Sequence, residues 1–317
     1  MPGPLPGDLH VDALTGPVIG YRNPDYIYSQ MFSEVSVKKQ TDIVPQYEQS
    51  PWFRDQASIR ARGTASAGGG FSTDVTLKYR CERYSFRTEI ADEDRDNADE
   101  PWQLDLAKAM FVADKIQMRK EIAMADDFFK TGVWQTDKTG GTDFTKWSDY
   151  GASQPLVDMA SFHDTIEGDI GMEANILAMG KQVWSKLRWH PDLIDLIKHT
   201  QIPDIQPERV ATFGGFDKVL VGRAIKTTAV EGTAESSVTY TRVWGKNFIM
   251  LHVPKAPSPF TPSAGYTYVW NRVPGASMWI KRMRDEEREV DIIEGNTYFD
   301  QLLIVKRAGL FGSGAVD

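Results

Sequence analysis

The sequence is poor in the residues that form disulfides, membrane spans and secretion signals. Its one cysteine, Cys81, excludes an intrachain disulfide and any zinc site made of several thiolates. The longest apolar stretches, such as NFIMLHV at residues 247–253, are far shorter than the roughly 20 residues of a membrane-spanning helix. The start, rich in proline and glycine, has neither the basic nor the apolar region of a signal peptide. We therefore expect no membrane contact, and we expect Cys81 to be a small apolar residue on a strand face.

Common catalytic and phosphate-binding motifs are also missing. The glycine-rich stretch GTASAGGG at residues 63–70 lacks the lysine of a phosphate-binding loop and lies between two strand patterns instead of before a helix. The acidic run at residues 92–96 has the first spacings of an EF-hand loop, but Asn97 stands where glycine is needed and Gln103 where glutamate is needed. We expect no catalytic residue, no cofactor, no metal site and no enzymatic activity.

One enzymatic alternative remains open, a metal-dependent hydrolase that would use His190, Asp192, Asp195 and His199. The two histidines flank one predicted helix, but their spacing of nine residues does not match the i, i+4 pair of a helical metal site. Histidines on the surface or at helix caps are the favoured interpretation. The hydrolase hypothesis would require a bound metal ion and a monomer or small oligomer.

The charge of the chain disfavours a dedicated nucleic-acid binder. The sequence has 36 basic and 44 acidic residues, a net charge of −8, which is the wrong sign for a protein that mainly grips phosphates. One basic cluster stands out, and we expect it to be a solvated strand face or to pair with carboxylates of a neighbouring chain. Its members are Arg60, Arg62, Lys78, Arg80, Arg83 and Arg87.

The pattern of the first 91 residues predicts an extended arm followed by a long hairpin. Residues 1–50 are rich in proline and carry only scattered apolar residues, so this arm can be ordered only against another surface. Residues 58–65 and 74–82 alternate with period two and predict two strands, joined by a flexible tip at residues 66–73. Such a hairpin would project roughly 25 to 30 Å. An isolated ribbon of that length is marginal in water, so we expect a partner to cover it.

The rest of the chain predicts a long helix and a compact α+β region. Residues 101–131 carry apolar residues at steps of three and four, which predicts one amphipathic helix of about 40 Å. From about residue 147 short strands alternate with helices, and strands with polar turns follow from about residue 276. We expect these last strands to return to the long helix. The fold class is therefore α+β.

This order of elements, together with several short sequence stretches, resembles the major capsid proteins of tailed bacteriophages. That fold also occurs in encapsulin shells and in herpesvirus capsid floors. The stretches that carry the resemblance are FTKWSDYGASQPLVDM (144–159), NILAMGKQVWSKLRWHPDLIDLIKHT (175–200), FGGFDKVLVGRAI (213–225) and GYTYVWNR (265–272).

The resemblance implies a domain plan. Residues 1–50 would be the N-terminal arm and residues 51–91 the extended β-hairpin, called the E-loop. Residues 92–150 and 276–317 would form the peripheral domain with its spine helix at about 101–131, and residues 151–275 the axial domain. No long charged helical segment precedes the arm, so a fused scaffolding domain is expected to be absent or already removed.

The resemblance also implies a function and its contacts. The chain would assemble with itself into hexamers and pentamers of an icosahedral phage head, made in the host cytoplasm, that encloses double-stranded DNA without sequence-specific binding. A separate scaffolding protein, a portal and a decoration protein are partners it allows. An encapsulin-type compartment shell is the alternative, disfavoured because the long arm stands where those shells keep a cargo-docking helix. The expected inter-subunit contacts are Arg60, Arg62, Gly68, Gly69, Gly70, Phe71, Lys78 and Arg80 on the hairpin and Tyr21, Tyr26, Tyr28 and Phe32 on the arm.

Overall fold

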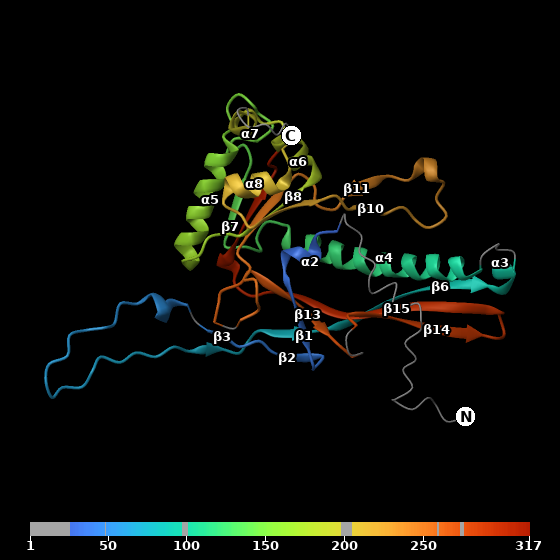
Figure 1. Ribbon diagram of the computed structural model, residues 1–317, viewed down its shortest axis with the longest axis horizontal. Coiled ribbons are helices and arrows are strands. Elements are labelled where there is room, and N and C mark those ends of the chain that lie inside the picture. Colours follow the sequence, from blue (N-terminus) through green and yellow to red (C-terminus); the bar gives the residue numbers. More distant parts are fainter. Residues whose placement is uncertain (1–25, 48, 97–100, 198–204, 259, 273–275) are drawn as a thin grey trace.

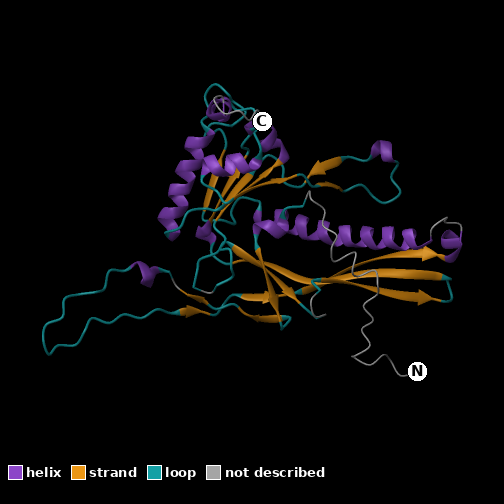
Figure 2. Ribbon diagram, viewed as in Figure 1, coloured by secondary structure: helices purple, strands orange, loops and turns teal. Residues whose placement is uncertain are grey.

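The computed structural model describes residues 26–47, 49–96, 101–197, 205–258, 260–272 and 276–317. Within these residues the chain is α+β, as the sequence predicts, and most of its strands belong to two five-stranded sheets. Figure 2 shows one long helix lying along the first sheet, shorter helices around the second sheet, and a loop that extends far from the body.

The first sheet is built around the long strand β15 (Val290–Leu303). β15 pairs antiparallel with β14 and β6 over its first residues and with β13 over its last residues, and β1 joins β13 in parallel. Nearly every residue in the first ten positions of β15 is buried, which is why its sequence shows little apolar–polar alternation. The other strands are β1 (Ser33–Val37), β6 (Glu82–Ala91), β13 (Gly265–Trp270) and β14 (Met278–Asp285).

The long predicted helix is present as α4 (Pro101–Phe128), 28 residues that span about 42 Å. It lies along β15 and β6 (Figure 1). Gly295 of β15 allows a close approach, because a Cβ at this position would lie 2.5 Å from Val112 Cγ1 and 2.9 Å from Ile116 Cδ1 of the helix. The helix therefore rests almost directly on the backbone of the sheet. The core between them consists of Ile90, Ala109, Val112, Ala113, Ile116, Met278, Ile280 and Ile293.

A network of ion pairs fixes the end of the sheet where α4 begins. Arg95 of the short helix α3 (Asp92–Asp96) lies 2.9 Å from Asp105 and 2.6 Å from Asp291. Arg282 reaches the same two carboxylates, at 2.8 and 3.0 Å. Because the two aspartate side chains are largely buried, their desolvation is compensated by two guanidinium groups each. The acidic run before the helix thus serves the fold, since its Asp92 also pairs with Arg284.

The second sheet has the order β7-β16-β12-β8-β9. Its central strands β8 (Ile176–Gly180) and β12 (Phe248–Leu251) are buried at every position, as expected when helices and loops cover both faces of a sheet. The edge strands are β7 (Thr136–Thr139) and β9 (Lys218–Gly222), and β16 (Gly309–Ser313) lies between β7 and β12. The helices around this sheet are α5 (Pro155–Ile170), α6 (Lys181–Leu187), α7 (Pro191–Ile197) and α8 (Pro207–Gly214).

The membership of the sheets differs from the expected domain boundaries. β7 and β16 were expected with the peripheral residues 92–150 and 276–317, but both pair within the second sheet. β13 was expected in the axial residues 151–275, but it pairs with β15 of the first sheet. The physical reason is that backbone pairing between strands far apart in the chain leaves no local pattern, so an apolar strand such as β16 fits either sheet until its neighbours are known.

The N-terminal segment from residue 26 is part of the subunit's own structure, which corrects the expectation of an arm ordered only against another surface. It forms α2 (Tyr28–Met31), β1, β2 (Thr41–Ile43) and β3 (Gln46–Tyr47). Ile27, Met31 and Phe32 are buried in the main core, and the Phe32 ring lies 5.0 Å from that of Phe128. These elements are too short to show a period, so their isolated apolar residues gave no signal. Residues 1–25, including Tyr21, lie outside the described residues.

A small antiparallel ribbon projects beside α4 (Figure 1). It consists of β10 (Ile225–Thr227) and β11 (Tyr240–Arg242), with a short 3-10 helix at Glu235–Ser237 beyond them. Lys226 Nζ lies 3.2 Å from Asp126 Oδ1 of α4 and ties the ribbon to the helix. Two further 3-10 helices occur, at Ser50–Phe53 and Lys306–Ala308. Within the described ranges, every helix is too short or too polar to cross a bilayer.

The close contact at Gly295 gives a test of the helix-on-sheet packing. Replacing Gly295 with valine should lower the free energy of unfolding by about 1 to 3 kcal/mol, because the added methyl groups overlap Val112 and Ile116. Chemical denaturation of the isolated chain measures the change. The matched control is Gly168→Ala in α5, where a Cβ meets no atom within 4 Å and alanine should stabilise the helix by up to about 1 kcal/mol. Equal effects of the two substitutions would contradict the packing described here.

Candidate functional site

The most prominent surface feature is an extended loop, residues 49–72, between β3 and β4 (Thr73–Asp74). β3 pairs with β4, and β2 pairs with β5 (Lys78–Arg80), so these short strands form the stem of the loop. Every residue from Trp52 to Thr76 is exposed. The loop reaches well beyond both sheets (Figure 1).

The stem differs from the predicted hairpin. The strand expected at residues 58–65 is absent, and the partner of residues 73–80 is the segment 41–47. The apolar positions of the alternation in residues 58–65 are small except for Ile59, which is fully exposed. Such a pattern has no cross-strand side chain to pack against, so period two alone gave the wrong strand.

The expected hairpin contacts fall into two groups. Arg60, Arg62, Gly68, Gly69, Gly70 and Phe71 lie on the extended loop, whereas Lys78 and Arg80 lie on β5 beside the body. Among the described residues neither Arg60 nor Arg62 has a carboxylate partner, and Arg60 Nε donates to the Thr64 carbonyl at 2.5 Å. Near the body, Arg83 pairs with Glu294 at 2.9 Å. The basic cluster is therefore partly neutralised within the chain and partly free on the loop.

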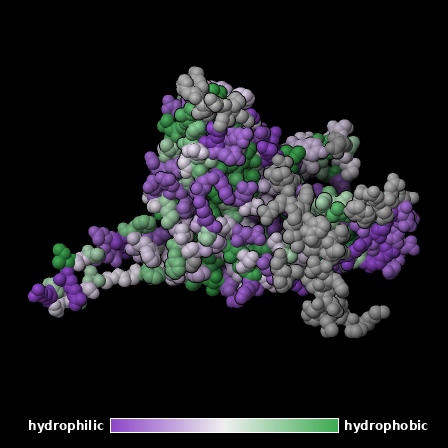
Figure 3. Space-filling view, in the orientation of Figure 1, coloured by the Kyte–Doolittle hydropathy of each residue, from purple (hydrophilic) through white to green (hydrophobic). Residues whose placement is uncertain are grey.

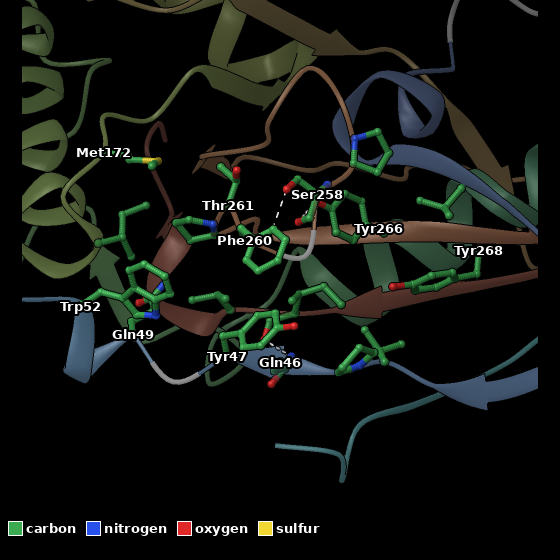
Figure 4. Close-up of a pocket in the computed structure, with 18 of the residues that line it drawn as sticks. Gln46, Tyr47, Gln49, Trp52, Met172, Ser258, Phe260, Thr261, Tyr266 and Tyr268 are labelled. Carbon is green, nitrogen blue, oxygen red and sulfur yellow. Dashed lines mark hydrogen bonds between the residues drawn. The ribbon is translucent and has the colours of Figure 1, made fainter. Parts of the chain in front are cut away.

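An apolar pocket of about 430 Å³, here called the base pocket, lies where the extended loop meets the body. Its walls come from segments 44–47, 49–53, 170–172, 257–258, 260–262 and 304–305, with β1 and β13 behind them, and none of the described residues that line it is charged. Figure 4 shows Tyr47, Trp52, Phe260 and Tyr266 around this space. Two aromatic contacts run along its rim, Tyr47 on Phe260 at 5.1 Å and Trp52 near Phe71 at 5.6 Å.

The base of the loop is held firmly although its tip is free. Gly171 ends α5 with a φ of +70°, and a Cβ there would lie 3.1 Å from Phe53 Cε1, so the Phe53 ring packs on the backbone at this glycine. Gln46 Nε2 donates to the Ile304 carbonyl at 2.9 Å. These contacts fix the direction in which the loop leaves the body. Figure 3 shows the loop as a thin projection with apolar and polar residues mixed along it.

The N-terminal segment is anchored by one buried carboxylate, Glu121 of α4. Its oxygens accept hydrogen bonds from the backbone N–H groups of Ile27 (3.0 Å) and Tyr28 (2.8 Å) and from the indole N–H of Trp244 (2.6 Å). Tyr26 and Tyr28 are half-buried on their own chain, where the Tyr26 hydroxyl donates to Asp114 at 3.3 Å.

This anchor corrects one of the expected arm contacts. Phe32 is buried inside the subunit and does not face a neighbour. A helical period of apolar residues does not reveal Glu121, because the residue is charged. An acid three residues from both Met118 and Met124 was the available signal, since residues three apart share a helix face.

Burial raises the pKa of Glu121 to about 7, although its three donors favour the carboxylate. In the unfolded chain the group would titrate near its ordinary value of about 4.3. Its contribution to stability is therefore fully present below about pH 4.3 and is lost as the pH rises through about 7. We expect the free energy of unfolding of the native sequence, minus that of Glu121→Gln, to fall by about 3 kcal/mol between pH 4 and pH 8.

Denaturation curves of the isolated chain at the two pH values measure this difference. Subtracting the variant cancels other titrating groups, such as His163 and His190, whose pKa values burial lowers. A difference that stays constant between pH 4 and pH 8 would show that Glu121 does not titrate in this range.

His190, the centre of the hydrolase alternative, is a buried cap of α7. Its Nδ1 accepts the backbone N–H of Asp192 at 3.2 Å, so the ring proton is assigned to Nε2, which lies 2.9 Å from Ser153 Oγ. Ser153 in turn donates to the Asp149 carbonyl at 2.5 Å. A histidine in this tautomer donates to the serine and cannot accept its proton, so the trio lacks the geometry of a nucleophile and its base.

Asp192 and Asp195, the hydrolase residues that the structure describes besides His190, are not part of a group suited to a metal ion. His199 lies outside the described residues, and in the part of the chain that is described no three His, Cys, Asp or Glu side chains are grouped to hold a metal ion. Cys81 is buried beside tyrosines, as expected for a small apolar residue, and burial raises the pKa of its thiol to about 12. A thiol of that pKa is a poor nucleophile at neutral pH.

Comparisons with known proteins point to one fold. No family model matches the sequence. The major capsid protein of Burkholderia phage BcepMu is 22% identical over 309 residues, which cover 95% of both chains. A crystal structure of a phage-related protein from Bordetella bronchiseptica RB50 superposes with a TM-score of 0.74 at 19% identity, over 96% of this chain and 97% of the other.

A capsid structure agrees with this result. The capsid of cyanophage P-SCSP1u superposes with a TM-score of 0.59 at 12% identity, over 96% of this chain and 93% of the other. Both superpositions extend over nearly the whole chain, so the likeness concerns the fold as a whole. The chain has the major capsid fold of tailed bacteriophages, which confirms the resemblance seen in its sequence.

Proposed function

We propose that this chain is a major capsid protein, a structural subunit that assembles with itself into the hexamers and pentamers of an icosahedral phage head. The observation that carries the proposal is the extended loop on a capsid fold, because every residue of the loop from Trp52 onward is exposed on its own subunit. Ordering such a segment costs conformational entropy that its own contacts do not offset. A neighbouring subunit that covers the loop would supply the missing contacts.

The chemistry of the loop suits such a contact. Trp52, Phe53, Ile59 and Phe71 expose large apolar surfaces, which is the usual mark of an interaction site. Arg60 and Arg62 carry charge without an acidic partner among the described residues. The glycines at 68–70 would let the tip adapt to neighbours that meet at different angles.

The contents and partners of the shell follow from the same proposal. The net charge of −8 suits a shell that encloses double-stranded DNA without binding it tightly. A scaffolding protein, a portal and a decoration protein are further proposed partners, the virion is the proposed location, and assembly would occur in the host cytoplasm. The alternative of an encapsulin-type compartment predicts particles that hold an enzyme. Electron microscopy and analysis of the contents of purified particles distinguish closed shells with DNA, closed shells with an enzyme, and no shells.

Shortening the extended loop tests its role. Gln56 and Gly69 lie side by side, since a Cβ at Gly69 would be 2.1 Å from Gln56 Oε1. Residues 57–68 can therefore be replaced by an Asn-Gly turn without moving the stem. We expect a folded subunit with an unchanged denaturation midpoint and at least a tenfold loss of closed particles in electron micrographs.

The matched control keeps the length of the loop and changes Arg60 and Arg62 to alanine. This variant should still form shells, with assembly that depends less on salt, because screened surface charges contribute little. If the shortened chain assembles as well as the native one, the loop is not an inter-subunit contact.

The contacts between subunits are proposed to be non-covalent. The loop from residue 49 to residue 72 contains no lysine, so it offers no amine for an isopeptide bond. Mature particles heated in detergent should run as single chains on a denaturing gel. A ladder of covalent multimers would contradict this proposal.

A further inference from the structure

We propose that the base pocket is a docking site for the proline-centred segment Leu14–Tyr21 (LTGPVIGY) of the same chain. Unlike the extended loop, this contact would latch the N-terminus to its own subunit, and it does not depend on assembly. Three observations support the proposal. They are the lining of the pocket, the sequence of the segment and the length of chain between the two.

The pocket has the character of a site for an uncharged, extended peptide. None of its lining residues is charged, and its rim is aromatic. Aromatic-lined grooves bind proline-containing segments, because the rings pack on the pyrrolidine and the extended backbone offers its carbonyls outward. At the rim, the Trp52 indole N–H, the Gln49 amide and the Tyr47 hydroxyl have no hydrogen-bond partner among the described residues. Figure 4 shows these three groups on one side of the space.

The sequence before residue 26 contains a segment that matches this pocket. Residues 13–21 carry no charged side chain, whereas the flanking residues include Asp12 and Arg22. Within the run, Pro17 precedes Val18 and Ile19, so one ring and two branched aliphatic side chains come together. Burying two such aliphatic side chains would favour the docked segment.

The connection is long enough for the segment to reach its own pocket. Val35 lines the pocket and lies nine residues after Tyr26, and Pro17 lies nine residues before it. Residues 28–31 are coiled into α2, so the path from Tyr26 to Val35 is shorter than nine extended residues. Nine extended residues span up to about 30 Å. The tether between Pro17 and Tyr26 therefore covers that distance.

The loop tip of a second copy is the competing occupant, and the charge argues against it. Ile59 is the large apolar residue of the tip, but Arg60 and Arg62 stand next to it. Docking Ile59 would bring two guanidinium groups to a pocket that offers no carboxylate, which costs desolvation without a compensating pair.

A pair of engineered cysteines tests the proposal in the full chain. Gly20→Cys and Thr261→Cys place one thiol near the end of the proposed occupant and one on the pocket wall, and leave the aromatic rim intact. The native Cys81 does not compete, because it is buried and its pKa is raised. In dilute, unassembled chains under mild oxidation we expect an intrachain disulfide, seen as a monomer that has lost both free thiols.

Two matched controls give the rate of disulfide formation expected without docking. Adding Val18→Asp keeps the same tether and should slow disulfide formation by about tenfold or more, because the buried carboxylate would have no partner. Gly7→Cys with Thr261→Cys places the thiol outside the segment and should react at that slower rate. Equal rates for all three proteins would overturn the proposal, and disulfide-linked dimers alone would assign the pocket to a second copy and overturn it too. Shell formation is not measured, so failure here leaves the proposed capsid function standing.

Discussion

The rest of the structure depends on the contact between α4 and the first sheet at Gly295. Because the helix rests on the backbone of β15, the two form one packed unit. The extended loop, the N-terminal segment and the second sheet all attach to this unit. β6 borders the sheet and continues into the stem of the extended loop. The N-terminal segment is hydrogen-bonded to Glu121 of the helix. The second sheet packs against the end of α4 through Phe129, whose ring lies 4.9 Å from Trp244 and 5.3 Å from Phe311.

The extended loop has a base that packs on the body and a tip that is exposed. At the base, Phe53 on Gly171 and Gln46 on Ile304 set the direction in which the loop leaves. At the tip every residue is exposed, and two arginines lack acidic partners among the described residues. A stem that carries an adaptable end can meet neighbours at more than one angle, as the subunits of the proposed shell of hexamers and pentamers would have to do.

The sequence was most informative where a pattern is local and long. Periodicity, and residues that favour helix ends, predict the helix at residues 101–128 and the elements between residues 155 and 251. The order of these parts was enough to recognise the fold. Pairing between distant strands leaves no local trace, so sheet membership cuts across the expected domain boundaries at β13 and β16, and the strand expected at residues 58–65 does not form. The base pocket and the Glu121 anchor each join segments far apart in the chain. Neither can be read from one stretch of sequence.

The topology of the first sheet also has a consequence during synthesis. β6 is complete at residue 91, but its partner β15 begins at residue 290. At about 5 to 20 residues per second, a ribosome needs roughly 10 to 40 seconds to make the chain between them. For that time β6 has no partner, and unpaired strands invite aggregation. The charged residues along it, among them Glu82, Arg83, Arg87 and Glu89, act as gatekeepers that keep the waiting strand in solution until the end of the chain emerges.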